Sequence, residues 1–485
     1  MSDTKKNLGY QTAYTIINTC VPLITSPYLS RVLEAKQLGV FSYSFSVITY
    51  FMLFAALGIE NHGTRTIAAA EGDDKKTNSL FWTIYAIELF ASVMAIIAYI
   101  VFCFTFCNNN RLIFAIMGFE LLASMLTINW LFFGLGEFKL SATRNIITKL
   151  ATVVCIFIFV KSPSDLWKYT AIMVAGNVLS QFILWFYLPK AIKPVRIRKT
   201  EFIDNVKQVL ILFIPILAMS VYQTMDKTML GLITGESSGF SESGFYYNAD
   251  KIVNIPIGVI GGIGTVLLPK ITGLIAKKDT QNANRLFCNS LELSVLVASA
   301  MAFGIAAVAK EFTPIFFGPG YEPCILLIVV LAPVMLIKAV SISARNQYLI
   351  PYHYDSKYIQ SVLLGVVVNL FSNILLIPRY GALGAVIGTL LAELAASAVQ
   401  MAFICRKVNM KLTAFKCFFY IFSGFVMLIM VRVLAHFLHG GVLCLGLEII
   451  CGAISYCLVI LIEYSVRNKQ NLLLSAKQIY RSFLT

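Results

Sequence analysis

The feature that most constrains this chain is its series of apolar stretches, each long enough to cross a bilayer and separated by short polar connections. A transmembrane helix takes about 20 mostly apolar residues, and backbone in hydrocarbon must find its hydrogen bonds internally. No alternation typical of strands is present. The sequence therefore predicts an all-α polytopic membrane protein with about 14 transmembrane helices. We expect these helices at about 8–30, 40–60, 81–105, 111–133, 145–160, 168–188, 208–233, 247–274, 288–309, 323–342, 358–378, 382–404, 415–435 and 442–463.

Composition supports the same class of protein. The chain is 58% hydrophobic and only 13% charged, which excludes a soluble fold. Its net charge of +15 would suggest nucleic acid in a soluble protein. Here the basic residues lie between apolar stretches, so we expect contacts with anionic membrane lipids and no nucleic-acid partner.

The distribution of Lys and Arg predicts the topology. With both termini in the cytoplasm, 29 of the 39 basic residues, Arg144 and Lys338 among them, are assigned to inner segments, as the positive-inside rule requires. The strongest basic breaks, at 190–207 and 406–416, divide the chain into an N-lobe (1–207), a C-lobe (208–410) and a segment of two helices and a cytoplasmic tail (411–485). A weak repeat relates the residues around Arg31 to those around Lys227, which favours two six-helix halves of the same orientation.

Ionisable residues inside apolar helices are costly, about 2.5–3.5 kcal/mol on insertion scales, so they mark candidate functional sites. Arg31, Asp226-Lys227 and Asp250-Lys251 all fall near outer helix ends. One interpretation is a cation-lined pathway for a phosphate-bearing substrate, and the other is a set of ion pairs that hold helix ends together.

Two carboxyl groups and several amides lie deeper in the predicted helices. Glu120 and Glu393 each fall midway along an apolar helix, where the carboxyl is either protonated and hydrogen-bonded or titrates during ion coupling. Polar stripes accompany them, and they suit either a hydrated cavity or hydrogen bonds between packed helices. The stripe residues are Asn177, Gln181, Asn369, Asn373 and Gln400.

Catalytic, metal and cofactor motifs are not expected. The 11 cysteines are scattered without a C-x-x-C pair, the four histidines lie at helix ends, and no phosphate-binding loop or nucleophile elbow occurs in a suitable context. We therefore expect no metal, no cofactor and no enzymatic activity.

Several ordered segments resemble bacterial polysaccharide flippases of the Wzx type, in the multidrug/oligosaccharidyl-lipid/polysaccharide exporter superfamily. The matching segments are 22–33, 39–44, 54–68, 129–138, 244–253 and 268–269. The resemblance implies a V-shaped core of two six-helix lobes plus two C-terminal helices. It also implies movement of undecaprenyl-diphosphate-linked oligosaccharide from the inner to the outer leaflet of the bacterial plasma membrane, for a surface glycan such as capsule or O-antigen. The sequence departs from the family after Trp130, where Phe133 and Gly136 replace polar residues.

The resemblance also assigns expected roles. Cations would contact the diphosphate of the substrate, and polysaccharide polymerase and glycosyltransferases are the partners implied. The expected substrate-binding residues are Arg31, Lys227, Lys251, Asp226 and Asp250, with Arg65 and Arg345 near the inner entrance. The last two helices suit either a groove for the lipid tail or packing against lipid.

Two other transport functions remain open at this stage. A multidrug or cation antiporter of the same superfamily would need an acidic cavity, against which the cations argue. A lipid II flippase would share the cations and the helix count, so only the resemblance separates it from a polysaccharide flippase.

Overall fold

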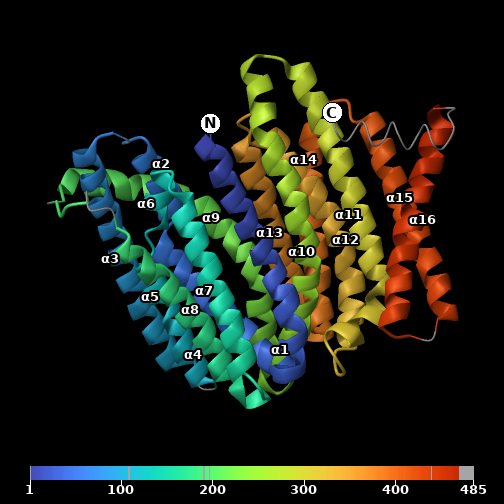
Figure 1. Cartoon of the computed structure of the whole chain (residues 1–485), viewed down its shortest axis with the longest axis horizontal. Coiled ribbons are helices and arrows are strands. Elements are labelled where there is room, and N and C mark those ends of the chain that lie inside the picture. Colours follow the sequence, from blue (N-terminus) through green and yellow to red (C-terminus); the bar gives the residue numbers. More distant parts are fainter. Residues whose placement is uncertain are drawn as a thin grey trace. The chain divides into compact units, whose positions relative to one another are not determined.

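The computed structural model describes residues 2–70, 72–107, 110–188, 192–195, 197–438 and 440–468. Across these residues the regular structure is helical (Figure 1). The helices are α1 (Ser2–Ala56), α2 (Ile59–Ala68), α3 (Asp74–Phe106), α4 (Arg111–Gly118), α5 (Glu120–Met125), α6 (Asn129–Gly134), α7 (Phe138–Phe159), η1 (Pro163–Asp165), α8 (Leu166–Phe186), α9 (Lys199–Ile233), α10 (Gly235–Ala276), α11 (Thr280–Phe316), α12 (Pro323–Ala344), η2 (Arg345–Leu349), α13 (Asp355–Tyr380), α14 (Ala382–Cys405), α15 (Lys411–Phe437) and α16 (Val442–Asn468).

The predicted all-α, multi-pass membrane fold is confirmed. Twelve helical segments within the described residues are long and apolar enough to cross a membrane, and the bent α9 raises the number to 13. The difference from the expected 14 arises in α1, which contains the first two predicted helices in one element. Glu34, with φ 61° and ψ 169°, interrupts the helical backbone between them.

Two other predicted helices are irregular. The helix expected at 111–133 consists of three short pieces, α4, α5 and α6. In α9 the segments Lys199–Ile214 and Ile216–Ile233 meet at an angle of 42°. Pro215 lies between them, and a proline inside a helix removes one backbone hydrogen bond and favours a kink. By contrast, α10 continues through Pro256 as a helix.

The chain forms two compact units, Met1–Tyr247 (unit 1) and Asn248–Thr485 (unit 2), and the boundary lies inside α10. Unit 1 contains α1 to α9 and the start of α10, and unit 2 contains the remainder. The lobe boundaries at 207 and 410 and the V-shaped arrangement of the lobes stay predictions. The predicted cytoplasmic tail lies outside the described residues from 469 onward.

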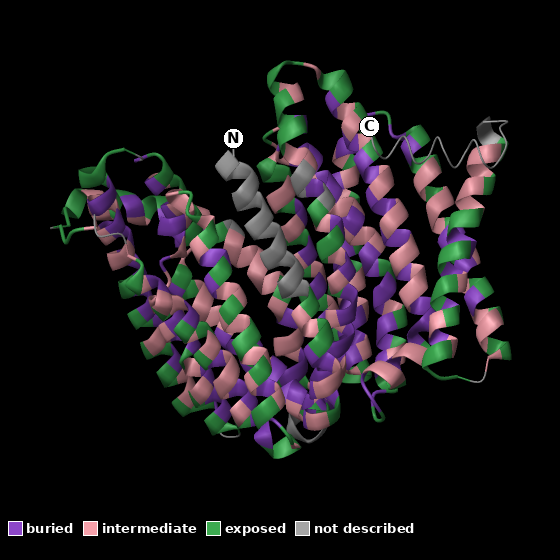
Figure 2. Ribbon diagram, viewed as in Figure 1, coloured by how far each residue is buried: buried purple, intermediate pink, exposed green. Residues whose placement is uncertain are grey.

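The outward surface of both units is apolar. Exposed residues line the helices along much of their length (Figure 2), and they include Phe104, which is 84% exposed, Phe186 and Leu443. A soluble protein rarely leaves large apolar surfaces in water, whereas hydrocarbon solvates them. The buried core of unit 1 instead contains Trp130 and Phe81.

Candidate functional site

Two adjacent pairs join α9 to α10 within unit 1. The buried carboxylate of Asp226 accepts a hydrogen bond from Tyr246 Oη at 2.7 Å. The next residue, Lys227, places Nζ 5.8 Å from the centroid of the Tyr247 ring. That ring contacts Phe41 of α1, with centroids 6.5 Å apart. The predicted Asp226-Lys227 pair therefore lies at a three-helix junction, where a cation is held near an aromatic face.

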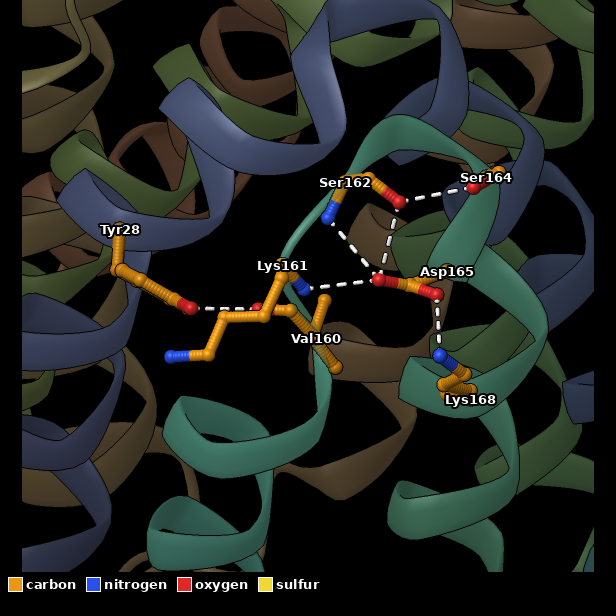
Figure 3. A network of polar contacts seen from close by, with 7 residues as sticks. All are labelled: Tyr28, Val160, Lys161, Ser162, Ser164, Asp165 and Lys168. Atoms are coloured by element: carbon orange, nitrogen blue, oxygen red, sulfur yellow. Dashed lines mark hydrogen bonds and ion pairs between the residues drawn. The ribbon is translucent and has the colours of Figure 1, made fainter.

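Arg31 lies on the exposed side of α1, and its Nη1 donates to the carbonyl of Pro27 at 3.0 Å. Tyr28 anchors this part of α1 because its hydroxyl donates to the carbonyl of Val160, at the end of α7 (Figure 3). The Nζ of Lys161 lies 5.8 Å from the centroid of the Tyr28 ring. A second cation, Lys161, thus lies next to the α1 segment that carries Arg31.

The turn between α7 and α8 is fixed by the carboxylate of Asp165 (Figure 3). Its Oδ2 accepts from the backbone amides of Lys161 at 2.9 Å and Ser162 at 3.0 Å, and from the Ser162 hydroxyl at 3.0 Å. Its Oδ1 forms an ion pair with Lys168 at 2.6 Å. The sequence analysis assigned this turn no role, although Ser162 and Asp165 have the spacing of a capping box.

Lys251 and Asp250 belong to unit 2, and both are half-buried. The Nδ2 of Asn254 donates to the side chain and the backbone carbonyl of Asp250. Because Arg31 and Lys227 belong to unit 1, the convergence of the three cations on one cavity stays a prediction. Arg65 is exposed on α2, and its place near the inner entrance stays a prediction.

Glu120 is buried in unit 1 and accepts a hydrogen bond from Asn177 Nδ2 at 2.8 Å. This contact joins α5 to α8 and pairs two residues that the sequence analysis treated separately. An amide donor satisfies a carboxyl oxygen whether or not the carboxyl is ionised. Both interpretations of Glu120, hydrogen-bonded acid and coupling group, therefore remain compatible with its surroundings.

Gln181 takes part in a buried network around Arg144. The guanidinium donates from Nη1 to the Ser180 carbonyl at 2.6 Å and to Gln181 Oε1 at 3.3 Å, and from Nη2 to Asn129 Oδ1 at 3.1 Å and Asn145 Oδ1 at 2.7 Å. Arg144 falls just before the helix expected at 145–160, and its charge suggests an inner connection. Since α7 begins earlier, Arg144 lies inside the helix and connects α6, α7 and α8.

We expect Arg144→Ala to reduce the stability of unit 1 strongly. The substitution removes a buried guanidinium that donates four hydrogen bonds between α6, α7 and α8, and a hydrogen bond made by a charged group contributes about 1.5–3 kcal/mol. Lys139→Ala is the matched control, because Lys139 is exposed on the same helix. The midpoint of thermal unfolding in detergent and the amount of protein in the membrane should fall for Arg144→Ala and stay near wild type for Lys139→Ala. Equal midpoints for the two variants would contradict the structural role of this network.

Glu88 is a functional candidate that the sequence analysis missed. It is buried in α3, and its Oε2 accepts from Trp130 Nε1 at 3.0 Å. The corner after Trp130 lacks the family's usual polar residues, and Phe133 there stacks on Phe138 with centroids 5.4 Å apart. The corner still makes polar contacts, because Trp130 binds Glu88 and the neighbouring Asn129 binds Arg144. The sequence signal for Glu88 is a carboxyl group within an apolar stretch, which marks a candidate functional site.

In unit 2, Glu393 has a partner that sequence neighbours did not reveal. The Nζ of Lys338 lies 3.5 Å from Glu393 Oε1, so this pair joins α12 to α14. Lys338, counted among the inner bases, lies within α12, inside the range expected to be helical. Arg345 begins the π-helical segment η2, a geometry often found at functional sites, and its guanidinium lies 4.9 Å from the centroid of the Tyr358 ring.

The polar stripe residues of unit 2 lie in helix contacts. Asn369, Asn373 and Gln400 are only 1%, 0% and 3% exposed. Asn373 Nδ2 donates to Asn369 Oδ1 at 3.2 Å, and Gln400 Nε2 donates to the Ser361 hydroxyl at 2.9 Å. A Cβ added at Gly388 would lie 2.4 Å from Asn373 Oδ1, so α14 packs closely against α13. The hydrogen bond of Asn373 lies within α13 and that of Gln400 joins α14 to α13, and both interpretations of the stripe, cavity lining and helix packing, stay predictions.

Two ion pairs fasten α15 to α11. Arg432 Nη1 lies 3.0 Å from both carboxylate oxygens of Glu311, and Lys416 Nζ lies 2.8 Å from Glu292 Oε2. Arg432 is one of the few charged residues in the last two predicted helices, and its pairing explains how it is tolerated there. Among the described residues, no cluster of three or more His, Cys, Asp or Glu side chains could hold a metal ion.

Comparison with known proteins places these features in context. Residues 4–275 match the model of a family described as "Polysaccharide biosynthesis protein". Over 411 residues the chain is 23% identical to the "Putative O-antigen transporter" of Escherichia coli (strain K12), covering 82% of this chain and 96% of that protein.

Solved structures share the fold at low sequence identity. The lipid II flippase MurJ in an inward closed conformation superposes with a TM-score of 0.75 and 13% identity, over 93% of this chain and 98% of that chain. An inward-facing multidrug resistance transporter of the MATE family, within the MOP superfamily, gives a TM-score of 0.59 and 12% identity, over 82% and 94%. The fold is therefore that of a helical membrane transporter.

Proposed function

The chain belongs to the polysaccharide biosynthesis protein family, in keeping with the resemblance to Wzx-type flippases, and we propose that it moves lipid-linked oligosaccharide across a bacterial plasma membrane. The substrate would be an undecaprenyl-diphosphate-linked repeat unit, carried from the inner to the outer leaflet for surface polysaccharide synthesis. Both termini would then lie in the cytoplasm, and alternating access would expose the site to each side in turn. The similarity to an O-antigen transporter along nearly the whole length of that protein carries this proposal.

The chemistry of the substrate supports a cationic site. A diphosphate with attached sugars does not cross about 30 Å of hydrocarbon unaided, because desolvating the charge is too costly. Arg31 and Lys227 offer positive charge in unit 1, and Lys251 offers it in unit 2. We propose that these cations contact the diphosphate, with Asp226 and Asp250 setting their orientation. Arg65 and Arg345 would act nearer the inner entrance.

The carboxyl groups supply candidates for ion coupling. Glu120 lies buried beside Asn177, and Glu393 lies beside Lys338. Protonation of Glu393 would release Lys338 from its pair, so a proton at this position changes the charge available to an anionic substrate. We propose Glu393 as the stronger coupling candidate, since its partner is itself a cation.

The proposed function is tested by locating lipid-linked repeat units in cells. Removing the gene is expected to make these units accumulate on the inner leaflet, and a plasmid copy should restore their appearance outside. Lipid II export, followed in the same cells, should continue at its normal rate. If lipid II accumulates inside while the surface glycan precursor still crosses, the proposal fails in favour of a lipid II flippase. Unchanged export of both, with altered sensitivity to cationic drugs, would favour an antiporter.

A further inference from the structure

A groove of about 470 Å³ runs along unit 1 between the second half of α3 and the helices α4 and α5. Its wall is formed mainly by aliphatic and aromatic side chains, and Arg111 is the charged residue among those that line it. The lining residues that matter for the argument are Ile100, Phe104, Ala115, Phe119, Cys107 and Arg111. We call this feature the α3–α4 groove.

The floor of the α3–α4 groove belongs to the packed core of unit 1. Tyr99, Phe114 and Leu121 are buried there, and the Tyr99 hydroxyl donates to the Phe114 carbonyl at 2.7 Å, which ties α3 to α4. A Cβ added at Gly118 would lie 3.0 Å from the Tyr99 ring, so the small residue allows the two helices to approach closely. The packing of α3 against α4 therefore forms the floor of the groove.

The rim of the groove is exposed and lies in the membrane-spanning part of the chain. Phe104 and Phe119 are exposed, and they belong to the spanning segments Asp74–Phe106 and Arg111–Gly134. An exposed apolar rim within membrane-spanning segments suits contact with acyl chains. An acyl chain in the groove contacts protein where it would otherwise contact other lipids, so its burial alone adds little binding energy. The shape of the groove and the charge of the headgroup therefore determine which lipid binds.

Charge at one end of the groove selects the headgroup. Arg111 is the first residue of α4, and it is exposed while its Nε donates to the Cys107 carbonyl at 3.1 Å. Burial, with a smaller effect of Cys103, raises the pKa of the Cys107 thiol to about 12, so this thiol is neutral at physiological pH and adds no charge to the groove. A cation at the polar end of an apolar groove is complementary to a lipid with a single negative phosphate.

We propose that the α3–α4 groove holds one acyl chain of an anionic phospholipid of the phosphatidylglycerol type, whose phosphate contacts Arg111. The single cation matches the single charge of that headgroup. None of the residues that line the groove is among those proposed above to bind the diphosphate. Its role would be to hold an ordered lipid against the surface of unit 1.

Native mass spectrometry of the purified full-length protein tests the site, with phosphatidylglycerol and phosphatidylethanolamine added in separate titrations. The wild type is expected to retain one phosphatidylglycerol more strongly than phosphatidylethanolamine. Arg111→Ala should weaken phosphatidylglycerol binding by about fivefold and remove the preference. Ala115→Trp should fill the groove and weaken both lipids. Arg379→Ala removes an exposed cation of unit 2 and should change neither affinity.

Three outcomes would overturn the assignment. Equal affinity of the wild type for the two phospholipids would show that the groove does not select a headgroup charge. Unchanged phosphatidylglycerol binding in both Arg111→Ala and Ala115→Trp would place the lipid elsewhere. Displacement of phosphatidylglycerol by an equal concentration of undecaprenyl phosphate, without the reverse, would assign the groove to a polyprenyl chain. Circular dichroism of each variant separates lost binding from misfolding.

Discussion

Gly39→Ala is expected to prevent stable folding of unit 1. A Cβ at position 39 would lie 1.5 Å from the carbonyl oxygen of Phe240, and one at Gly244 would lie 1.9 Å from the carbonyl oxygen of Ala35. Both obstacles are backbone atoms of neighbouring helices, so a side-chain rotation does not relieve the overlap. The two glycines face each other across the contact between α1 and the start of α10. Separating these backbones disrupts the packing around them and should cost more than about 3 kcal/mol.

Two other glycines of α10 provide controls, because alanine at these positions should leave stability unchanged or raise it. A Cβ at Gly258 or Gly273 would meet no heavy atom within 4 Å, and alanine favours a helix over glycine by about 0.5–1 kcal/mol. Gly39→Ala and Gly244→Ala should therefore aggregate or accumulate poorly, whereas Gly258→Ala and Gly273→Ala should unfold at or above the wild-type temperature. Fluorescence-detected gel filtration with a thermal ramp measures both. A monodisperse Gly39→Ala protein of normal stability would disprove the close approach.

The positions of the helices follow from the sequence because the membrane leaves few choices. Each long apolar stretch must satisfy its own backbone hydrogen bonds, which makes it a helix wherever it begins. The ends of helices are harder to predict, since a basic residue can belong to a polar connection or to a helix in which other protein groups bind it. Arg144 illustrates this limit: its charge suggested a connection, while the structure buries it inside α7.

The helical periodicity of the sequence does not reveal which residues of different helices contact each other. A 3.6-residue repeat assigns residues to a face but does not say which other helix that face meets. Glu88 and Trp130 lie on α3 and α6, and Lys338 and Glu393 lie on α12 and α14. Likewise, a polar stripe fits both a wet cavity and a packed contact, and the spacing of the residues does not reveal that Asn373 is buried.

Arg31→Ala and Lys227→Ala are each expected to reduce glycan export by about tenfold to a hundredfold. A hydrogen bond to a charged group contributes about 1.5–3 kcal/mol, and a factor of ten corresponds to about 1.4 kcal/mol. Each substitution would remove one such contact with the diphosphate in a region where water does not replace it. Lys227→Arg keeps the charge and should retain most of the export.

Protein abundance and thermal stability distinguish this role from a structural one. Because a contact with the diphosphate forms only when substrate is bound, both alanine variants are expected to accumulate and to unfold like the wild type. Lys277→Ala, an exposed cation of unit 2, is the control and should export normally. Normal export by both Arg31→Ala and Lys227→Ala would rule out diphosphate binding by these cations. Loss of export together with loss of protein would instead assign them to holding helix ends together, because a contact made only with substrate leaves the empty transporter unchanged.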